Sequence, residues 1–108
     1  MTPDGGQERR KFPRIPVAVA VELRHAGAAT PMRVTTTEMS FGGCYIETMF
    51  TLAVGTELAM GFWINDQKIE AKGVVATCFP QVGNGITILE MTPEDRAKLE
   101  SFLKAHET

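Results

Sequence analysis

The feature that most constrains the fold of this chain is a two-residue alternation of large apolar side chains. Between residues 17 and 24 it occupies every second position, with Glu22 and Arg24 on the opposite face, and its members are Val17, Val19, Val21 and Leu23. Because successive side chains of a strand point to opposite faces, this period predicts a β-strand with one buried face. A chain built from such strands must cover one face of a sheet with another part of itself.

Five more segments are predicted as strands, and turn residues separate them. Asn65-Asp66-Gln67 is a plausible hairpin turn, and glycines at 42–43 and 83–85 interrupt the chain again. The six predicted strands cover residues 17–24, 32–38, 44–47, 58–64, 69–79 and 86–90. Short strands that recur about every ten residues between turn signals are typical of an antiparallel barrel or sandwich.

A single helix is predicted after the last strand. Thr92 suits the N-cap position, and Pro93 suits the first helical position, where a missing N–H costs nothing. Two acidic residues follow, as the positive end of the helix dipole favours. Three apolar residues then fall on one helical stripe, namely Leu99, Phe102 and Leu103. The predicted fold class is all-β with one C-terminal helix, which we expect to pack over the sheet or over one end of a barrel.

Length and composition fit one globular domain. With 108 residues, of which 44% are hydrophobic and 22% charged, the chain can bury one core without disulfides or a structural metal. We expect residues 1–7 to be a flexible leader, because they contain Pro3, Gly5 and Gly6 and little to bury, and residues 8–108 to form the domain. Neither a signal peptide nor membrane insertion is predicted, which favours a cytoplasmic protein.

The charge distribution argues against a protein that coats DNA or RNA. Eleven basic and thirteen acidic residues give a net charge of -2, whereas such proteins need a basic surface. The one dense basic cluster lies between Arg9 and Arg14. A local cluster on a mildly acidic protein indicates a specific small anion rather than DNA.

Neither a metal site nor an enzyme active site is predicted. The usual ligand residues are scattered along the chain: Cys44, Cys78, His25 and His106. Zinc requires about four ligands at short paired spacings. Ser40 is the one serine in a glycine-rich setting, but Glu38 stands where a nucleophile elbow has glycine, and no histidine partner is evident. Without a nucleophile, base and orienting group, no catalysis and no cofactor are expected.

The basic segment before the first predicted strand is one candidate for ligand binding. It reads Glu8-Arg9-Arg10-Lys11-Phe12-Pro13-Arg14. Arginine presents five N–H donors in a rigid fork that suits phosphate oxygens and the O6/N7 edge of guanine. The alternative is a solvated basic tail, or ion pairs with the acidic C-terminal helix, which contribute little at a protein surface. The residues alone leave both interpretations open.

The segment Glu38-Met39-Ser40-Phe41-Gly42-Gly43 is the second candidate. A carboxylate accepts hydrogen bonds from the N1–H and the amine of guanine, and Ser40 adds a hydroxyl. The two glycines allow a ligand to approach the backbone closely. The alternative is a turn between strands, in which the glycines adopt positive φ and the serine caps the turn. Taken alone, this segment favours the turn.

Together the two segments resemble the signature of the PilZ domain family. Arg10-x-x-x-Arg14 followed by Glu38-x-Ser40-x-x-Gly43 is similar to the family pattern of RxxxR and then [Asp/Asn]xSxxG, and the resemblance extends over residues 8–104. It implies a six-stranded antiparallel β-barrel with a C-terminal α-helix. It also implies a receptor for cyclic di-GMP, a bacterial second messenger that controls behaviour such as motility.

The resemblance also implies which residues bind the ligand. The arginines would hold phosphates and guanine edges, and Ser40 and the Gly43 backbone would line the pocket. Glu38 stands where the family has Asp or Asn, and its extra methylene extends the side chain by about 1.5 Å, a carbon–carbon bond. The predicted ligand-binding residues are Arg9, Arg10, Arg14, Glu38, Ser40, Gly42 and Gly43.

The mechanism implied by the resemblance is a change of surface on ligand binding. The segment Arg9 to Arg14 would become ordered over the barrel and alter the face shown to an unidentified downstream protein. The domain is expected to be a monomer or a weak dimer. The alternative is a PilZ-fold adaptor that no longer binds cyclic di-GMP and acts only through protein–protein interaction.

Overall fold

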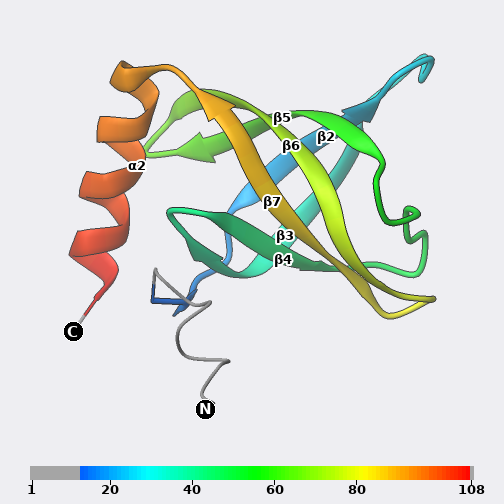
Figure 1. Cartoon of the computed structure of the whole chain (residues 1–108). Coiled ribbons are helices and arrows are strands. Elements are labelled where there is room, and N and C mark those ends of the chain that lie inside the picture. Colours follow the sequence, from blue (N-terminus) through cyan, green and yellow to red (C-terminus); the bar gives the residue numbers. More distant parts are fainter. Residues whose placement is uncertain (1–12, 108) are drawn as a thin grey trace, which may run out of the picture.

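A computed structural model of the chain describes residues 13–107 (Figure 1). The predicted leader, residues 1–7, and the predicted ligand-binding residues Arg9 and Arg10 lie outside the described residues. The elements are β1 Ile15–Pro16, β2 Ala20–His25, β3 Met32–Ser40, β4 Gly43–Glu47, β5 Glu57–Ile64, β6 Gln67–Phe79, β7 Gly83–Met91 and α2 Pro93–His106.

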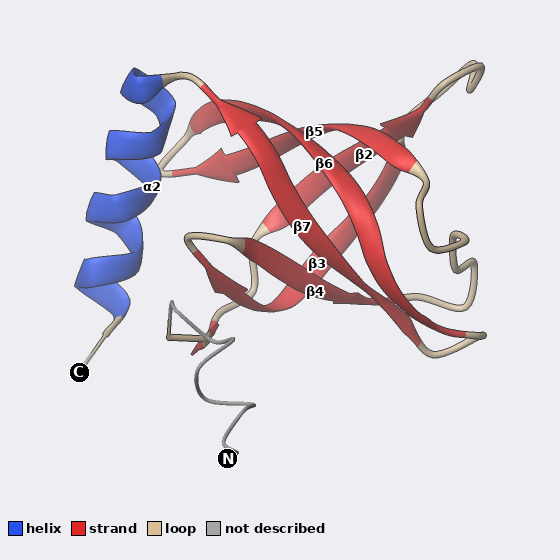
Figure 2. Ribbon diagram, viewed as in Figure 1, coloured by secondary structure: helices blue, strands red, loops and turns tan. Residues whose placement is uncertain are grey.

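Six of the strands form a closed antiparallel barrel (Figure 2). Their order around the barrel is β3-β2-β5-β6-β7-β4, and the pairing of β4 with β3 closes it. The two-residue strand β1 is additional and pairs with the end of β3. The predicted six-stranded barrel is therefore confirmed and the sandwich is excluded. Closure leaves the six barrel strands without an unpaired edge.

The first predicted strand, residues 17–24, is interrupted, and the strand β2 begins only at Ala20. The cause is Thr36 of β3, whose hydroxyl accepts a hydrogen bond from the Val19 N–H at 2.9 Å and donates one to the Val17 carbonyl at 2.7 Å. This side chain is buried and occupies backbone groups that a continuous ladder would use. The predicted inward face is nevertheless correct for Val19, Val21 and Leu23.

The core is made by the alternating residues that the sequence indicates. On β5 the buried side chains are Leu58, Met60, Phe62 and Ile64, and on β6 they include Ile69, Ala71 and Val75. The hairpin between these strands turns through Asn65 and Asp66, both with positive φ, at 50° and 65°. Two such residues in a two-residue loop give the turn whose twist matches antiparallel strands. The predicted hairpin is confirmed.

The helix α2 lies across one end of the barrel (Figure 2). Thr92 caps it as predicted, because its hydroxyl accepts the Asp95 N–H at 3.1 Å. The Asp95 carboxylate in turn accepts the N–H of Glu70 on β6 at 3.1 Å, which ties the first helical turn to the sheet. Leu99 and Leu103 are buried in the barrel core, so the predicted apolar stripe seals this end.

Three register shifts break the regular alternation of the barrel strands. Each inserts one extra residue, Thr37 in β3, Ala76 in β6 and Leu89 in β7. A β-bulge of this kind redirects the side chains around it. The shift at Ala76 explains why Phe79, which the alternation would place inside, is 55% exposed. All three bulges adjoin one of the two hollows of the outer surface.

Candidate functional site

A groove of about 510 Å³ runs over the outer surface of β3, β4, β6 and β7. We call it the β3–β4 groove. It is lined by five of the seven residues that the sequence predicts for the site, namely Arg14, Glu38, Ser40, Gly42 and Gly43. The fold brings these residues together because β1, which follows Arg14 directly, pairs with Glu38 and Met39 near the end of β3.

Glu38 and Arg14 form an ion pair at the mouth of the groove. Arg14 Nη1 lies 3.5 Å from Glu38 Oε1, and the two side chains are 58% and 36% exposed. The bulge at Thr37 precedes Glu38 and resets the direction of its side chain. Exposed ion pairs of this kind contribute less than about 1 kcal/mol. The pair therefore keeps Arg14 beside the groove but is weak enough for the arginine to change partner.

The turn between β3 and β4 is closed by Ser40. Its Oγ accepts a hydrogen bond from the Gly42 N–H at 3.1 Å, and the Gly42 carbonyl accepts the Ile88 N–H at 2.8 Å. Ser40 thus caps the turn between the strands, as the turn interpretation of this segment predicted. The positive φ that the same interpretation expected for Gly42 and Gly43 is not found, because the positive-φ glycines among residues 13–107 are Gly27 and Gly55. The Ser40 hydroxyl keeps its hydrogen available to donate to a ligand.

Gly43 is required by the packing of β4 against β7. It pairs with Thr87, and a Cβ at this position would overlap the carbonyl oxygen of Ile86. The sequence suggests two roles for this glycine, admission of a ligand to the backbone or positive φ in a turn, and neither is this packing contact. The structure adds a packing role, because the close approach of two strands sets the width of the groove floor.

An aromatic pair forms one wall of the groove. Tyr45 of β4 and Phe79 of β6 have ring centroids 6.5 Å apart at an interplanar angle of 53°. The sequence does not predict either ring at the site, because alternation along the predicted strand 69–79 places Phe79 inside the barrel. The bulge at Ala76 shifts this alternation and exposes Phe79 on the outer face. Exposed aromatic rings beside polar groups are platforms on which nucleobases stack.

Cys44 is a lining residue of the groove whose thiol is held neutral. Its side chain is buried, and burial raises the pKa of its thiol to about 12. A thiol held neutral in this way packs as a small apolar residue and is neither a nucleophile nor a metal ligand. Residues 13–107 contain no group of three or more His, Cys, Asp or Glu side chains arranged to hold a metal ion.

The groove has little charge of its own. Of its described lining residues, only Arg14 and Glu38 are charged, and they neutralise each other. The other predicted cations, Arg9 and Arg10, lie outside the described residues. A dianionic ligand therefore needs the N-terminal arginines to balance its charge, whereas a guanine base finds donors, acceptors and aromatic rings already in place.

Residues 8–105 match the family model described as the PilZ domain, so the chain belongs to the PilZ family. No curated protein sequence matches the chain. The match covers both signature segments and the barrel with its closing helix.

Several solved structures share this fold, and three of them are similar over most of this chain. The PilZ domain of CeSA from a cellulose-synthesizing bacterium has a TM-score of 0.70 at 12% identity, covering 88% of this chain and 99% of that one. MotI/DgrA, the inhibitor of motility from Bacillus subtilis, has a TM-score of 0.71 at 18% identity and covers 90% of this chain. PlzA from Borreliella burgdorferi, solved in complex with c-di-GMP, has a TM-score of 0.68 at 15% identity and also covers 90%.

The chain spans only part of two of these proteins. The match covers 50% of MotI/DgrA and 42% of PlzA, so both contain a further region beyond the barrel. Within residues 13–107, no helix has the length and apolar character needed to cross a membrane.

Proposed function

We propose that this PilZ domain is a receptor for cyclic di-GMP, with a binding role and no chemistry of its own. The observation that carries the proposal is the juxtaposition in one groove of Arg14, Glu38 and Ser40 with the Tyr45–Phe79 pair. These groups come from separate segments of the chain and together match a guanine nucleotide. The complex of the structural neighbour PlzA with c-di-GMP supports the same ligand.

A guanine base enters the groove against the aromatic wall. Stacking on Phe79 contributes about 1–3 kcal/mol per base. The Glu38 carboxylate accepts hydrogen bonds from the guanine N1–H and amine, and the Arg14 guanidinium donates to the O6/N7 edge or to a phosphate. Arg9 and Arg10 supply the remaining positive charge that the two phosphates require.

Binding exchanges the partner of Arg14. In the free protein its guanidinium faces the Glu38 carboxylate at 3.5 Å, and the ligand offers a phosphate to the arginine and two guanine N–H groups to the glutamate. Glu38 reaches Arg14 because it has one methylene more than the Asp or Asn typical of the family. The exchange lowers the affinity by the free energy of the exposed ion pair, less than about 1 kcal/mol.

The signal passes to a downstream protein through the apolar end of the barrel, the exposed residues Met49, Phe50 and Val82. Val82 belongs to the β6–β7 turn, donates its N–H to the Phe79 carbonyl at 2.8 Å and accepts the Thr48 N–H at 3.0 Å. Residues 48–56 and 73–89 contain no charged side chain, and depletion of charge with exposed large apolar groups marks the core of protein interfaces. A ligand stacked on Phe79 therefore touches the edge of this surface.

Calorimetric titration of the full chain with cyclic di-GMP tests the proposal. Arg14→Ala removes a charge-assisted hydrogen bond and Phe79→Ala removes a stacking face, so each weakens binding at least about tenfold. The matched controls are Lys104→Ala and Trp63→Ala, an exposed cation and an exposed aromatic outside the groove. Equal affinity in Arg14→Ala and wild type rejects the site.

The second candidate function is an adaptor that works without the ligand. The Arg14–Glu38 ion pair favours it, because it occupies the two charged groups that the ligand needs. The structural neighbour MotI/DgrA is named as an inhibitor of motility, a role exerted on other components. If wild type fails to bind cyclic di-GMP and Glu38→Asp also fails, the adaptor function replaces the receptor function.

A further inference from the structure

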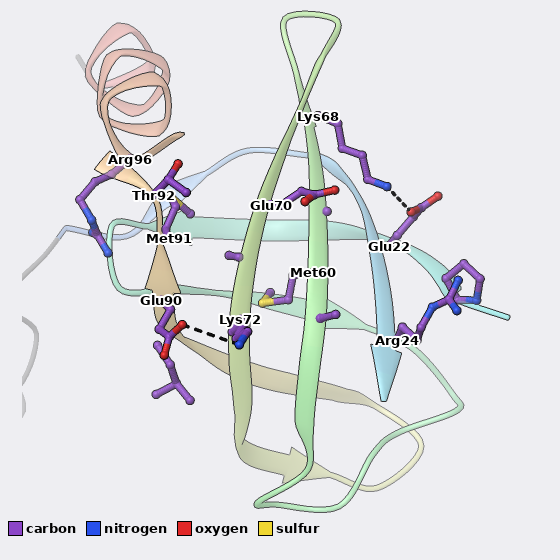
Figure 3. Close-up of a pocket in the computed structure, with 15 residues that line it drawn as sticks. Glu22, Arg24, Met60, Lys68, Glu70, Lys72, Glu90, Met91, Thr92 and Arg96 are labelled. Carbon is purple, nitrogen blue, oxygen red and sulfur yellow. Dashed lines mark ion pairs between the residues drawn. The ribbon is translucent and has the colours of Figure 1, made fainter. Parts of the chain in front are cut away.

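A second hollow of about 740 Å³ lies on the outer face of β2, β5, β6 and β7, beside the first turn of α2 (Figure 3). It shares no lining residue with the β3–β4 groove. None of the signature residues within the described part of the chain, residues 13–107, lines it. Its side chains therefore call for a separate explanation.

The floor of this hollow is a trough along β5, where small residues stand between long ones. Strand register places Ala59 between Arg24 of β2 and Lys72 of β6, and Lys72 opposite Glu90 of β7. Two residues further along β5, Gly61 is the neighbour of charged residues on both sides. Because adjacent strands are about 4.8 Å apart, the two walls stand about 10 Å from each other. An extended peptide backbone fits within that width.

One end of the trough is closed by a salt bridge that crosses β5. Lys68 Nζ lies 3.1 Å from Glu22 Oε1, and a Cβ on Gly61 would lie 2.5 Å from the Lys68 side chain. The lysine therefore uses the space that glycine leaves. Arg33 contacts the other oxygen of Glu22 at 3.1 Å, and the hydrogen bond from Lys68 is the main reason that the pKa of Glu22 is lowered. The negative charge of the Glu22 carboxylate is thus balanced by Lys68 and Arg33.

The remaining charges of the trough leave a positive surplus. Its lining contains four basic residues, Arg24, Lys68, Lys72 and Arg96, and three acidic ones, Glu22, Glu70 and Glu90. Arg24 and Arg96 form no salt bridge with residues 13–107, and neither does Glu70. The charge of Arg24 does contribute to the lowered pKa of Glu22, after Lys68 and Arg33. Figure 3 shows Arg24 and Arg96 on opposite sides of the hollow with Lys72 between them. This surplus stands out on a chain whose net charge is -2.

The bulge in β7 adds an apolar contact to the trough. Because Lys72 pairs with Glu90 and Gly73 pairs with Ile88, Leu89 is the inserted residue. The insertion turns both Leu89 and Glu90 outward, and Leu89 is 55% exposed at the edge of the hollow. Bulges that expose an apolar side chain next to a concave surface are frequent at binding sites.

We propose that this trough binds an acidic segment of a partner protein. Carboxylates of the segment meet Arg24 and Arg96, and an apolar side chain contacts Leu89 above the Ala59 floor. The trough is open to solvent, because the paired side chains of Lys72 and Glu90 are 75% and 72% exposed. An open trough suits a peptide better than a small molecule, which usually binds in an enclosed pocket. With four basic and three acidic lining residues, the positive surplus is too small for the continuous phosphate backbone of a nucleic acid, which needs an extended basic surface.

NMR titration of the full chain at low ionic strength tests this inference. The probe is a short acetylated peptide of alternating glutamate and leucine, and its matched control has glutamine in place of glutamate. We expect amide shifts confined to the trough, at Arg24, Ala59, Lys72, Leu89 and Arg96. Arg24→Ala removes one charged contact and Ala59→Leu fills the floor, so each weakens binding at least about tenfold, whereas Lys104→Ala, an equal loss of charge on α2, has no effect.

Every other outcome overturns the inference. Absence of shifts with the glutamate peptide excludes the site, and equal binding of the glutamine peptide excludes charge recognition. Tighter binding of a single-stranded oligonucleotide to the same residues identifies a nucleic-acid surface instead. Because the site shares no residue with the β3–β4 groove, the cyclic di-GMP affinity of Arg24→Ala and Ala59→Leu equals that of wild type if the receptor function holds, and either result can fail without the other.

Discussion

At the scale of single residues, position 38 is where this chain departs from the pattern of its family. The bulge at Thr37 directs Glu38 toward the groove, and the longer side chain brings its carboxylate to Arg14. An aspartate at the same position has the same acceptors on a shorter and less flexible arm. In the proposed receptor, the extra methylene therefore favours an internal ion pair at the expense of part of the ligand contact.

We expect Glu38→Asp to bind cyclic di-GMP more tightly than wild type. The shorter side chain loses less rotamer entropy and releases Arg14, and the gain is about 0.5–1.5 kcal/mol, one net hydrogen bond. Glu38→Ala should weaken binding, because the guanine N–H groups lose their acceptor. Calorimetry measures both affinities. Weaker binding by Glu38→Asp would mean that the groove is adapted to glutamate.

We expect the buried thiol of Cys44 to make the domain less stable as the pH becomes alkaline. The thiol has a pKa of 9.0 when unperturbed and of about 12 in the folded chain. The folded-state pKa is raised, so the contribution of this neutral thiol is complete below pH 9 and is lost as the pH rises toward 12. Over this window we expect the free energy of unfolding to fall by up to about 1.4 kcal/mol per pH unit.

Urea unfolding at a series of pH values checks this effect. Cys44→Ala lowers stability at neutral pH, because it leaves a small cavity, but it removes the thiol's share of the alkaline slope. The matched control is Cys78→Ala, which removes a partly buried cysteine and leaves Cys44 in place. Identical slopes for wild type and Cys44→Ala would show that other groups cause the alkaline loss.

At the scale of elements, the strands are predictable from the sequence but their irregularities are not. The two-residue period identifies the buried face of β5, where four alternate side chains are inside. A bulge such as the one at Ala76 arises from the pairing register of β6 with β7, which depends on contacts between distant segments. The aromatic wall escaped prediction for this reason, since Phe79 changes face at that bulge.

Gly43 is a predicted ligand-binding residue that the structure also shows to be required for strand packing. Gly43→Ala places a methyl group against the Ile86 carbonyl, and β4 must move away from β7 to admit it. We expect a loss of about 2–4 kcal/mol in the free energy of unfolding, typical of a steric conflict with backbone. Ser40→Ala is the control and removes only the turn cap, at a cost of about 0.5–1.5 kcal/mol. Equal losses would contradict the packing role.

The loop between β4 and β5 depends on one buried amide. Asn84 is fully buried, accepts the Leu52 N–H at 2.8 Å and donates to the carbonyls of Leu52 and Thr77 at 2.9 and 3.1 Å. The sequence indicates only a turn residue at this position. Its role could not be predicted, because Leu52 lies 32 residues away.

We expect Asn84→Ala to destabilise the domain by about 2–4 kcal/mol, because three backbone groups lose their partner. Hydrogen exchange of the Leu52 amide should accelerate, and that of Phe62 in the core should change only with global stability. The measurements are urea unfolding and native-state exchange. An unchanged Leu52 exchange rate would show that the loop is held by other contacts.

At the scale of the whole molecule, we propose that the barrel and the N-terminal arginines contribute separately to the site. The barrel positions Glu38, Ser40 and Phe79 by itself, because all three lie on strands of the closed sheet. Arg14 is attached to it through Ile15, which is buried and pairs with Met39. The sequence predicts a basic contribution from this segment, but only the pairing of β1 with β3 shows which end of β3 Arg14 approaches.

Deleting residues 1–14 separates the two contributions. Ile15 and β1 remain, and the exposed Arg14–Glu38 pair is worth less than about 1 kcal/mol, so the truncated domain should unfold at nearly the same urea concentration as the full chain. Its affinity for cyclic di-GMP should fall at least about a hundredfold, since three charge-assisted contacts to phosphate and guanine are lost. Deleting only residues 1–7 is the control and should leave the affinity unchanged, because it retains all three arginines. If the chain that lacks residues 1–14 folds and binds as tightly as the full chain, recognition lies in the barrel alone. If it fails to fold, the basic segment has a structural role in holding β1 against β3.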